Sequence, residues 1–549
     1  MKRAWLWPIG AGISIAMGAA VYSFPIWYEG TFVGWSLIDD AMISLTYARN
    51  LVKGCGLVWQ CGGERVEGYT NLGWVLYMAL WHWVGLSEKW VGLPIVLTGA
   101  VTLGLHLRAV YLVAREIGGE GVALWASWIG ALFLPLIFHH ISGLEAGFLA
   151  MLLTYWAYWT IKGEVKVWVY AIVAALGTLV RMDFILGVVA IGIAGAWLYQ
   201  KEPQRIIPFI GAIGVAFLVG GATTLWRVSY YKMWVPNTYV LKVSSLPISW
   251  RIWNGTFSFL MHVLMNIPLW LAAGIGFWFL RGSSRILPLL AVSGIYLLYN
   301  TYVGGDIYET SATSNRFLLN AFPLLFVLSG YALERLSLHF VLKILAIGFI
   351  AYGTPRLKSD LLFHRWKNFV DILGENQRYF INLDQFFSHN AVVMVGRAGL
   401  LPYFHGDKYI WRDYLGKTDT SVAQRGHLVL CNGRPGYLYF PGHTRHDVLG
   451  LWRVDGAVQL VEGPICDPHR EGPRWQWKWA LPLGATHCPA TLPSYFPFPS
   501  AAVRDSFCQL FDLVEPNGSV WRRRKPTLLS PQTLAPVDTT HRPSAHSGR

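Results

Sequence analysis

Two adjacent carboxylates, Asp39 and Asp40, are the side chains of this 549-residue sequence best placed to do chemistry. They follow directly on the first apolar run, where a charged group is unfavourable unless it faces water or a partner. A carboxylate can serve as a general base, because it accepts a proton from a weak nucleophile such as a hydroxyl group. Its neighbour can orient the nucleophile or raise the pKa of the first carboxyl through like-charge repulsion. The sequence leaves open which of the two is the base, and also whether both only cap a helix and face solvent.

The segment after the pair has the pattern of a helix. Asp is a preferred N-cap, because its oxygens accept hydrogen bonds from the free N–H groups of the first turn. Apolar residues then recur at helical spacing as far as Val52, and Gly54 is a suitable C-terminal stop. We predict a short amphipathic helix on the membrane surface, with the two carboxylates at its head. Thr70 or Asn71 is placed to cap the helix that follows.

The composition is that of a polytopic membrane protein. The chain is 54% hydrophobic and only 14% charged, whereas soluble domains carry about 25% charged residues. Its net charge of +14 would suggest nucleic acid in a soluble protein. Here much of that charge lies in short loops and the far C-terminus, which favours orientation in the membrane and contact with anionic lipid. The first apolar run, residues 4–27, has no convincing cleavage site, so we interpret it as a retained anchor.

Further apolar runs alternate with loops of two kinds. Loops rich in lysine and arginine occupy alternate connections, and we place these in the cytoplasm. Every acidic or mixed-charge constellation then falls on the opposite, extracytoplasmic face. We predict about eleven transmembrane helices, which requires one of the two apolar runs between residues 71 and 113 to be re-entrant or to lie flat. The runs after the first are 71–86, 90–113, 121–139, 144–161, 167–182, 184–200, 206–228, 256–280, 285–303, 318–334 and 340–354.

The composition changes near residue 356, where long apolar runs stop. We predict a transmembrane catalytic domain over residues 1–355 with its first extracytoplasmic loop at 29–70, a soluble extracytoplasmic α/β domain over 356–521, and a disordered basic tail over 522–549. Cys55 and Cys61 flank a short turn in the first loop, and the other cysteines lie in the C-terminal third. None has CxxC metal spacing. An oxidising compartment favours disulfides, but the sequence does not give their pairing.

Several short motifs resemble those of a known enzyme family. The first loop resembles that of bacterial GT-C glycosyltransferases, and most closely that of the mycobacterial terminal β-(1→2)-arabinofuranosyltransferases (AftB) and their bacterial relatives. The motifs of that loop are Ile38-Asp39-Asp40-Ala41, Tyr47-Ala48-Arg49-Asn50-Leu51 and Glu64-Arg65-Val66-Glu67-Gly68-Tyr69-Thr70-Asn71. The elements that follow in the family's order are Ser142-Gly143-Leu144-Glu145, Arg181-Met182-Asp183, Pro236-Asn237-Thr238-Tyr239 with Lys242, Gly304-Gly305-Asp306 with Arg316-Phe317, Gly399 to Tyr403, Asp413 to Gly416, and Gly442-His443.

The resemblance implies a GT-C fold and transfer of a sugar, with inversion, from a polyprenyl-phosphate donor to a hydroxyl group of a cell-envelope glycan. It implies that Asp39 or Asp40 is the catalytic base. The charge that develops on the leaving lipid phosphate needs cations at the membrane surface, for which the motifs offer Lys242, Arg316 and Arg181. The residues expected to bind the substrates are Arg49, Glu67, Tyr69, Glu145, Asn237, Tyr239, Asp306 and His443.

The expected partners are the lipid-linked donor, a glycan acceptor and membrane lipids, with no nucleic acid. The expected location is the plasma membrane, with the active site and C-terminal domain extracytoplasmic. No cofactor and no divalent metal are expected for a monophosphate donor, whereas two adjacent carboxylates would suit such an ion if the donor were a pyrophosphate. Arabinofuranose is one candidate sugar. The alternatives are transfer to protein or lipid, and a lipid-linked sugar flippase, which would place ionisable residues near the bilayer midplane on broken helices.

Overall fold

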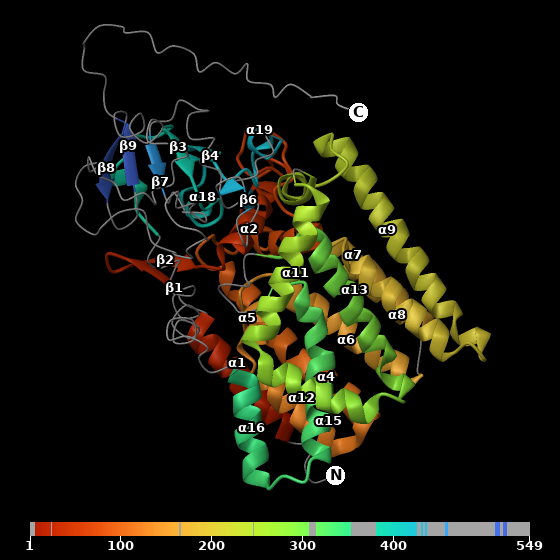
Figure 1. Ribbon diagram of the computed structural model, residues 1–549. Helices are drawn as coiled ribbons and strands as arrows, with labels where there is room; N and C mark the ends of the chain where they lie inside the picture. Colours follow the sequence, from red (N-terminus) through yellow and green to blue (C-terminus); the bar gives the residue numbers. More distant parts are fainter. Residues whose placement is uncertain are drawn as a thin grey trace, which may run out of the picture.

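The fold is a bundle of apolar helices with a small mixed sheet beyond one end (Figure 1). We analysed a computed structural model, which describes residues 6–22, 25–163, 166–244, 246–306, 315–352, 380–424, 430–431, 434–435, 456–458, 511–515 and 520–523. In Figure 1 the sheet lies above α2, at the opposite end of the molecule from the lower ends of α15 and α16. The bundle therefore carries the sheet at one end, and the described residues from 380 onward are here called the C-terminal domain.

The helices form where the apolar runs are, and local signals end them. Five of them begin with a proline in the first two positions, where the missing N–H has no partner in any case. Gly163 and Gly304 each end a helix in the left-handed conformation. The helices of the bundle are α1 (Leu6–Tyr22), α2 (Asp39–Val52), α3 (Leu72–Trp83), α4 (Gly92–Leu132), α5 (Leu134–Ile141), α6 (Ala146–Lys162), α7 (Val167–Val180), α8 (Phe184–Leu198), α9 (Ile207–Tyr231), α10 (Asn237–Tyr239), α11 (Ile248–Met265), α12 (Ile267–Leu280), α13 (Leu287–Val303), α15 (Phe322–Arg335) and α16 (Phe340–Tyr352).

Helix lengths support a membrane protein but not a particular number of crossings. Among the described residues, three helices are long and apolar enough to span, namely α4, Pro203–Tyr231 and Ser284–Val303. Two bent pairs, α5 with α6 and α11 with α12, raise this to five if each pair is one span. The predicted count of about eleven stays a prediction. α3 has 12 residues, about 18 Å of helix, which is too short for a bilayer core of about 30 Å. This length agrees with the prediction that one of the two apolar runs between residues 71 and 113 does not cross the membrane.

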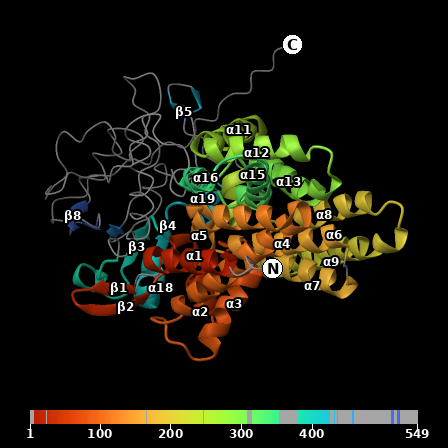
Figure 2. The ribbon, with the colours of Figure 1, turned by 90° about the horizontal axis from the view of Figure 1, so that it is seen from below.

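α4 is the central helix of the bundle. It packs against α1, α6 and α15, while α12 packs on α15 and α7 on α9. Seen from below, α11, α12, α13, α15 and α16 lie on one side of α4, and α2, α3 and α7 lie on the other (Figure 2). A break at Gly119, where φ is 85°, divides α4 into two helical stretches at the boundary between the predicted runs 90–113 and 121–139.

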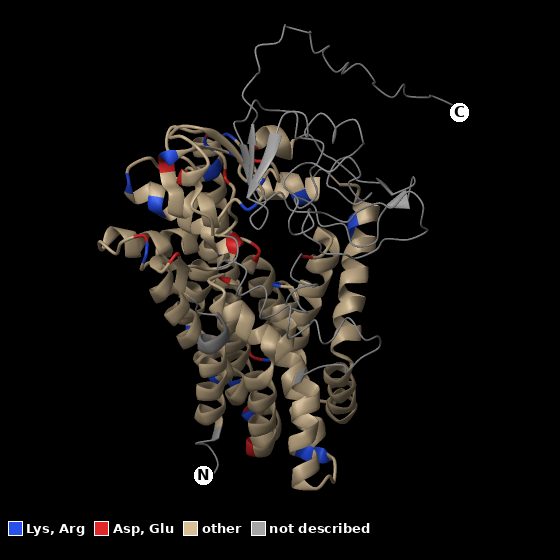
Figure 3. Ribbon diagram, turned by 90° about the vertical axis from the view of Figure 1, so that its left-hand side faces the viewer, with Lys and Arg blue, Asp and Glu red and all other residues tan. Residues whose placement is uncertain are grey.

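Charged residues lie mainly towards the two ends of the bundle, and the helices between them are largely apolar (Figure 3). Many large apolar side chains of α9, α11 and α16 are exposed, among them Leu218, Trp253 and Leu345. In water this surface would be unfavourable, whereas lipid tails are a suitable neighbour for it. The charge and burial pattern is therefore that of a membrane-embedded bundle.

The described part of the C-terminal region forms a five-stranded sheet with the order β4-β3-β7-β9-β8. β3 is parallel to β4 and β7, whereas β9 is antiparallel to β7 and β8. The predicted basic tail over 522–549 begins inside β9, and residues 524–549 lie outside the described ranges. The elements are β3 (Val392–Val395), α18 (Leu400–His405), β4 (Ile410–Asp413), α19 (Thr420–Ala423), β5 (Leu430–Cys431), β6 (Arg434–Pro435), β7 (Gly456–Val458), β8 (Phe511–Glu515) and β9 (Val520–Arg523), while β1 (Pro25–Tyr28) and β2 (Thr31–Trp35) form a hairpin before α2.

α2 begins and ends close to the predicted positions, but it has no solvated face. Its residues from Ala41 to Asn50 are all buried. It packs against α3 on one side and α18 on another. The prediction of a polar side open to solvent is wrong, because the chain that follows α2 covers it: Ser44, Tyr47 and Asn50 bond to Asn71, Val66 and Val58. The position of α2 at the membrane surface stays a prediction.

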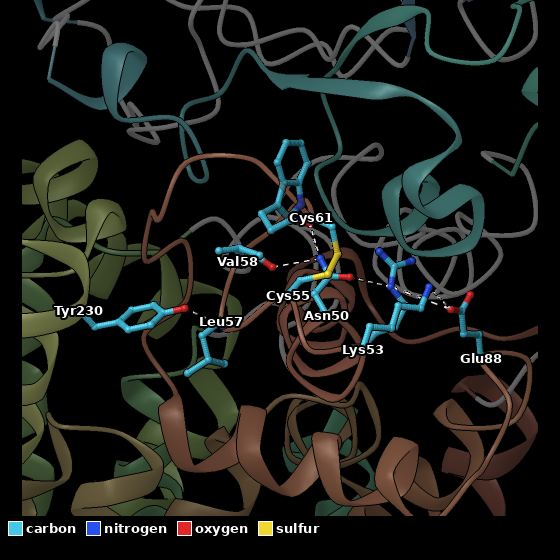
Figure 4. The surroundings of a disulfide bond; sticks show 10 residues. Asn50, Lys53, Cys55, Leu57, Val58, Cys61, Glu88 and Tyr230 are labelled. Atoms are coloured by element: carbon cyan, nitrogen blue, oxygen red, sulfur yellow. Dashed lines mark hydrogen bonds and ion pairs between the residues drawn. A yellow bond between two sulfur atoms is a disulfide. The ribbon is translucent and has the colours of Figure 1, made fainter.

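The loop after α2 is closed by a disulfide between Cys55 and Cys61, whose Cα atoms are 5.3 Å apart (Figure 4). Asn50 donates from its side-chain amide to the carbonyls of Val58 and Trp59, at 3.0 and 2.9 Å. The same loop reaches outward, since the Tyr230 hydroxyl on α9 accepts from the N–H of Leu57 and the Trp59 indole donates to the carbonyl of Ala398. The loop therefore joins the helical bundle to the C-terminal domain.

Removing this disulfide is expected to destabilise the protein. In the double variant Cys55→Ser/Cys61→Ser the unfolded chain regains the freedom of a short closed loop, which corresponds to about 2 kcal/mol. The purified variant should melt at a lower temperature in detergent, and wild type treated with reductant should melt as the variant does. A double variant that melts with the oxidised wild type would contradict this prediction.

Candidate active site

A cavity opens where the head of α2 meets the ends of several helices and the C-terminal domain. Its empty volume is about 840 Å³, including the space at its mouth. Its polar lining comes from segments far apart in the sequence, which the fold brings together. The lining residues are Asp40, Ile43, Ser44, Gly68, Tyr69, Thr70, Asn71, Leu144, Glu145, Arg181, Thr238, Tyr239, Lys242, Val243, Tyr299, Val303, Gly305, Asp306, Arg316, Phe317 and Lys417.

Asp40 is the carboxylate of the predicted pair that faces this cavity. Its Oδ1 accepts a hydrogen bond from Lys417 Nζ at 2.7 Å, and its Oδ2 from Arg316 Nη2 at 3.3 Å. Burial by itself raises the pKa of Asp40, but the positive charges of Lys417, Arg316 and Lys242 outweigh it and hold the pKa well below its usual range. The side chain is therefore a carboxylate at neutral pH and can accept a proton from a ligand in the cavity.

Arg316 is held by a second carboxylate in a forked contact. Its Nε and Nη2 donate to Asp306 at 2.8 and 3.0 Å, so the guanidinium bridges Asp306 and Asp40. Asp306 follows Gly304 and Gly305, whose φ angles are 88° and 86°. Only glycine adopts such angles without strain, which explains why a Gly-Gly turn carries this carboxylate. Arg316 in turn lowers the pKa of Asp306 against the opposing effect of burial.

Lys242 brings an ammonium group to the cavity without an ion-pair partner among the described residues. It lies on a π-helical turn, Val240–Ser244, directly after α10. Wide turns of this kind often occur at functional sites. Burial and the charge of Arg316 lower the pKa of Lys242 to about 8, although Asp40 acts in the opposite direction. An unpaired, partly buried ammonium is suited to an anionic ligand.

A chain of hydrogen bonds fixes the opposite wall of the cavity. The Ser44 hydroxyl on α2 donates to the side-chain oxygen Oδ1 of Asn71 at 3.0 Å. The side-chain Nδ2 of Asn71 donates to Glu145 Oε2 at 2.7 Å. Arg181 then bridges Glu145 Oε1 at 2.7 Å and Asp183 at 2.9 Å. Arg181 is thus occupied by two carboxylates, and its role in the structure is to hold this wall.

Asp39 does not line the cavity, although it is next to Asp40. Its Oδ1 accepts hydrogen bonds from the backbone N–H groups of Gly399 and Leu400, at 3.1 and 2.9 Å. These belong to the first turn of α18, whose free N–H groups attract a carboxylate. The predicted role as N-cap of its own helix is therefore replaced by capping a helix of the other domain. The two carboxylates therefore have separate hydrogen-bond partners.

Three predicted substrate residues lie outside the cavity and bind other parts of the protein. Arg49 is 2% exposed and donates to the carbonyls of Tyr403 and Pro402 at the end of α18. Glu67 is 2% exposed and pairs with Arg227 of α9. Asn237 is fully buried and holds the backbone of the C-terminal domain. These side chains are occupied within the protein and are not available to a ligand in the described cavity.

Of the remaining residues that the sequence predicts for substrate binding, some line the cavity and one lies outside the described residues. Tyr69 and Tyr239 line the cavity, where the Tyr69 hydroxyl contacts that of Tyr231 at 3.0 Å and the Tyr239 hydroxyl contacts that of Tyr302 at 2.7 Å. His443 lies outside the described residues. The structure thus brings Asp40, Lys242, Arg316, Arg181, Glu145, Asp306, Tyr69 and Tyr239 to one cavity.

Sequence reasoning missed two residues of the site. Lys417 was not singled out, although it follows directly on the Asp413 to Gly416 motif. Asn71 was predicted to cap α3, but its side chain makes no capping bond and holds Glu145 instead. Position next to a motif was the one available signal for Lys417, because nothing local distinguishes it from a surface lysine.

The charges of the cavity favour a monoanionic ligand. Among the described lining residues, Arg181, Lys242, Arg316 and Lys417 are positive and Asp40, Glu145 and Asp306 are negative, so the net charge is +1. Within the same residues, no three His, Cys, Asp or Glu side chains form a group that could hold a metal ion. The expectation of a reaction without a divalent metal stays a prediction.

Comparison with known proteins gives one curated relative. The chain is 26% identical over 339 residues to the terminal β-(1→2)-arabinofuranosyltransferase of Corynebacterium glutamicum, which covers 53% of this chain and 47% of that protein. The chain therefore spans about half the length of the relative it matches. The resemblance that the motifs indicate is confirmed at this level. No family model matches the chain.

Two solved structures are similar to this chain with TM-scores below 0.5. One is ArnT from Cupriavidus metallidurans bound to undecaprenyl phosphate, with a TM-score of 0.48 and 11% identity, covering 75% of this chain and 86% of that one. The other is the oligosaccharyltransferase AglB from Archaeoglobus fulgidus in complex with an inhibitory peptide and a dolichol-phosphate. Its TM-score is 0.45 with 11% identity, covering 83% of this chain and 69% of that one.

The role of Asp39 as a cap predicts a stability effect that depends on its acceptor oxygen. Asp39→Ala removes the hydrogen bonds to Gly399 and Leu400 and should lower the free energy of unfolding by about 1 kcal/mol. Asp39→Asn keeps an oxygen in the same place and should lose much less. Thermal unfolding of the purified variants in detergent measures both, and equal losses in the two variants would contradict the capping role.

Proposed function

We propose that this protein is an inverting glycosyltransferase of the GT-C type, which moves a sugar from a polyprenyl-phosphate donor to a hydroxyl group of a cell-envelope glycan. The observation that carries the proposal is that one carboxylate of the Asp pair, Asp40, faces a cavity together with Lys417, Arg316 and Lys242. Proton acceptance and binding of a leaving phosphate are the two tasks that such a transfer requires, and these residues can do both. The arabinofuranosyltransferase likeness makes arabinofuranose our first candidate for the sugar.

Asp40 acts as the general base in this proposal. As the acceptor oxygen forms a bond to the anomeric carbon, its proton passes to the Asp40 carboxylate. The bond between the anomeric carbon and the phosphate oxygen breaks, and its electron pair leaves with the lipid phosphate. Attack opposite to the leaving group inverts the configuration at that carbon. Asp40 Oδ2 accepts from Arg316 in the described state, so binding of the donor phosphate, which attracts Arg316, frees this oxygen to accept the proton, while Lys417 stays on Oδ1.

The donor phosphate lies near Lys242 and Arg316 in this proposal. A phosphodiester of a sugar and a lipid carries one negative charge, which matches the net charge of +1 of the described cavity lining. Lys242 has no ion-pair partner among these residues, so it binds the phosphate without first breaking a contact. Arg316 offers a planar fork, which suits phosphate oxygens, and its contact with Asp306 fixes its orientation. Arg181 faces the cavity but is held by Glu145 and Asp183, so we assign it to the wall.

The position of the cavity fits a lipid-linked donor. It lies where the helical bundle meets the C-terminal domain, so a polyprenyl chain can stay among the apolar helices while the sugar phosphate enters the cavity (Figure 1). We place this end of the bundle on the extracytoplasmic face of the plasma membrane, because the loops at the other ends of the helices carry the lysine and arginine excess. The acceptor glycan then approaches from the side of the C-terminal domain.

The proposal is tested by transfer with the purified full-length protein in detergent. Synthetic polyprenyl-phosphate sugars, arabinofuranose included, are offered with a pool of envelope glycans, and products are read by mass spectrometry. Asp40→Asn removes the base and should reduce kcat by on the order of 10²–10⁴-fold. Asp384→Asn removes a carboxylate from an exposed ion pair with Lys408 and serves as the matched control.

Each outcome of this experiment has a clear meaning. Transfer by wild type and by Asp384→Asn but not by Asp40→Asn supports the proposal. Wild type that binds donors but transfers none to any acceptor, or Asp40→Asn that transfers at the wild-type rate, would overturn it. Movement of the intact donor between the leaflets of a vesicle by the reconstituted protein would then identify a flippase.

The role of Lys242 predicts the alkaline side of the pH profile. Its pKa of about 8 means that the ammonium is present below that pH and is lost as the pH rises through it. The kcat/KM for the donor, which reports on the free enzyme, should therefore fall above about pH 8. Lys242→Arg should move this fall to higher pH, because a guanidinium stays protonated. Lys232→Arg, at the exposed end of α9, is the control and should not change the pH profile. An unchanged profile in Lys242→Arg would contradict a role of Lys242 in donor binding.

A further inference from the structure

The cation nearest to Asp40 comes from the C-terminal domain. Lys417 lies between β4 and α19, is 7% exposed, and places its Nζ 2.7 Å from Asp40 Oδ1. The two residues are separated by 377 positions in the chain. Each of the other cations near Asp40, Arg316 and Lys242, belongs to the helical bundle. One of the three positive charges around the carboxylate thus depends on the position of a separate domain.

The segment that carries Lys417 is built rigidly from inside the C-terminal domain. The Asp413 carboxylate at the end of β4 is fully buried and accepts from the N–H groups of Leu415 and Thr418, at 3.0 and 2.8 Å. It also accepts from the Thr418 hydroxyl at 3.0 Å. Gly416, with φ at 82°, permits the tight turn between them. The backbone on both sides of Lys417 is therefore fixed by one carboxylate.

The helical bundle holds the same segment from outside. The amide of Asn237, next to the cavity, donates to the carbonyls of Gly416 and Lys417 at 2.9 and 3.1 Å. A Cβ atom added at Gly68 would lie 3.0 Å from the carbonyl oxygen of Lys417 and 2.7 Å from the Thr418 side chain, so the two backbones approach closely there. Lys417 is therefore positioned by contacts of both domains and not by its own flexibility.

We propose that the C-terminal domain completes the active site by supplying Lys417 as the positioning residue for the base Asp40. The inference rests on the proposed function for its catalytic meaning, but the contact itself is independent of it. Lys417 keeps Asp40 ionised and turned towards the cavity, and it does so only while the C-terminal domain is docked. The docking contacts of Asp39 and Arg49 on α18 then serve catalysis indirectly, since they hold the domain that carries the lysine.

A packing role alone does not account for this lysine. An ammonium group is costly to bury and is rarely buried without a partner, so an apolar residue would serve better if the interface needed only filling. Removing Lys417 should leave Asp40 with fewer cations and raise its pKa, because one close opposite charge is lost. The charged groups that face Asp40 are Lys417, Arg316, Lys242, Asp306 and Asp39.

The first test measures the ionisation of Asp40 directly in the purified full-length protein. A carbodiimide reacts with protonated carboxyl groups, and mass spectrometry gives the labelled fraction of Asp40 at each pH. Lys417→Met should move the midpoint of labelling upward by about 1–3 pH units. Lys417→Arg should restore the wild-type midpoint. Lys408→Met, which breaks the exposed ion pair with Asp384 in the same domain, should not move it.

The same variants are compared in sugar transfer. The acid limb of the kcat profile should move upward in Lys417→Met by the same interval as the labelling midpoint and return in Lys417→Arg. If Lys417→Met does not fold, the reciprocal variant decides: Asp40→Asn should make Lys417 react with acetic anhydride at lower pH than in wild type, because its ammonium loses the carboxylate that stabilises it.

The outcomes separate this inference from the proposed function. An unchanged Asp40 midpoint in folded Lys417→Met overturns the inference, and so does unchanged Lys417 reactivity in Asp40→Asn. If wild type transfers no sugar, the proposed function fails, but the labelling midpoints still decide whether Lys417 holds Asp40. A shifted midpoint with a parallel shift of the acid limb supports both.

Discussion

A carboxylate that is removed from bulk water stays ionised only if cations surround it, and the site of this protein depends on that constraint. Asp40 is flanked by Lys417 and Arg316, with Lys242 close by. Lys417 comes from a loop of the C-terminal domain, Arg316 from the segment before the 3-10 turn Leu318–Ala321, and Lys242 from a π-helical turn. The first two segments must be placed to within hydrogen-bonding distance of Asp40. Much of the architecture around the cavity can therefore be understood as the means of holding cations near one side chain.

The two neighbouring carboxylates of α2 point in different directions and have different roles. Successive residues on a helix point about 100° apart, so Asp39 and Asp40 cannot easily serve the same ligand. Asp39 turns to α18 and accepts from its first N–H groups, whereas Asp40 turns to the cavity. The pair thus links domain docking and proton acceptance within one turn of helix. A displacement of α18 would move both the cap and Lys417.

The interface between the two domains is polar and extends well beyond the cavity. Arg49 and Trp59 donate to carbonyls of the C-terminal domain, and Asn237 binds the backbone on either side of Lys417. Most of these groups are charged or polar side chains paired with backbone atoms, which fixes orientation more closely than apolar contact does, because each bond has a defined distance and direction. The disulfide-closed loop after α2 contacts both α9 and the C-terminal domain (Figure 4). Docking of the domain adds Lys417 to a cavity whose other lining residues come from the helical bundle and its loops.

The sequence by itself determined what local patterns can encode. The apolar runs, the start of α2 at the Asp pair and most cavity residues, including Asp40, Lys242, Arg316 and Asp306, follow from periodicity, charge and short motifs. Tertiary structure decided which carboxylate faces the cavity and that α2 is buried. It also decided that Arg49, Glu67 and Asn237 form contacts within the protein and do not line the cavity. It also decided that Lys417 joins the site. The physical reason is that each of these depends on contacts between residues up to hundreds of positions apart, such as Lys417 with Asp40, and no local spacing records them.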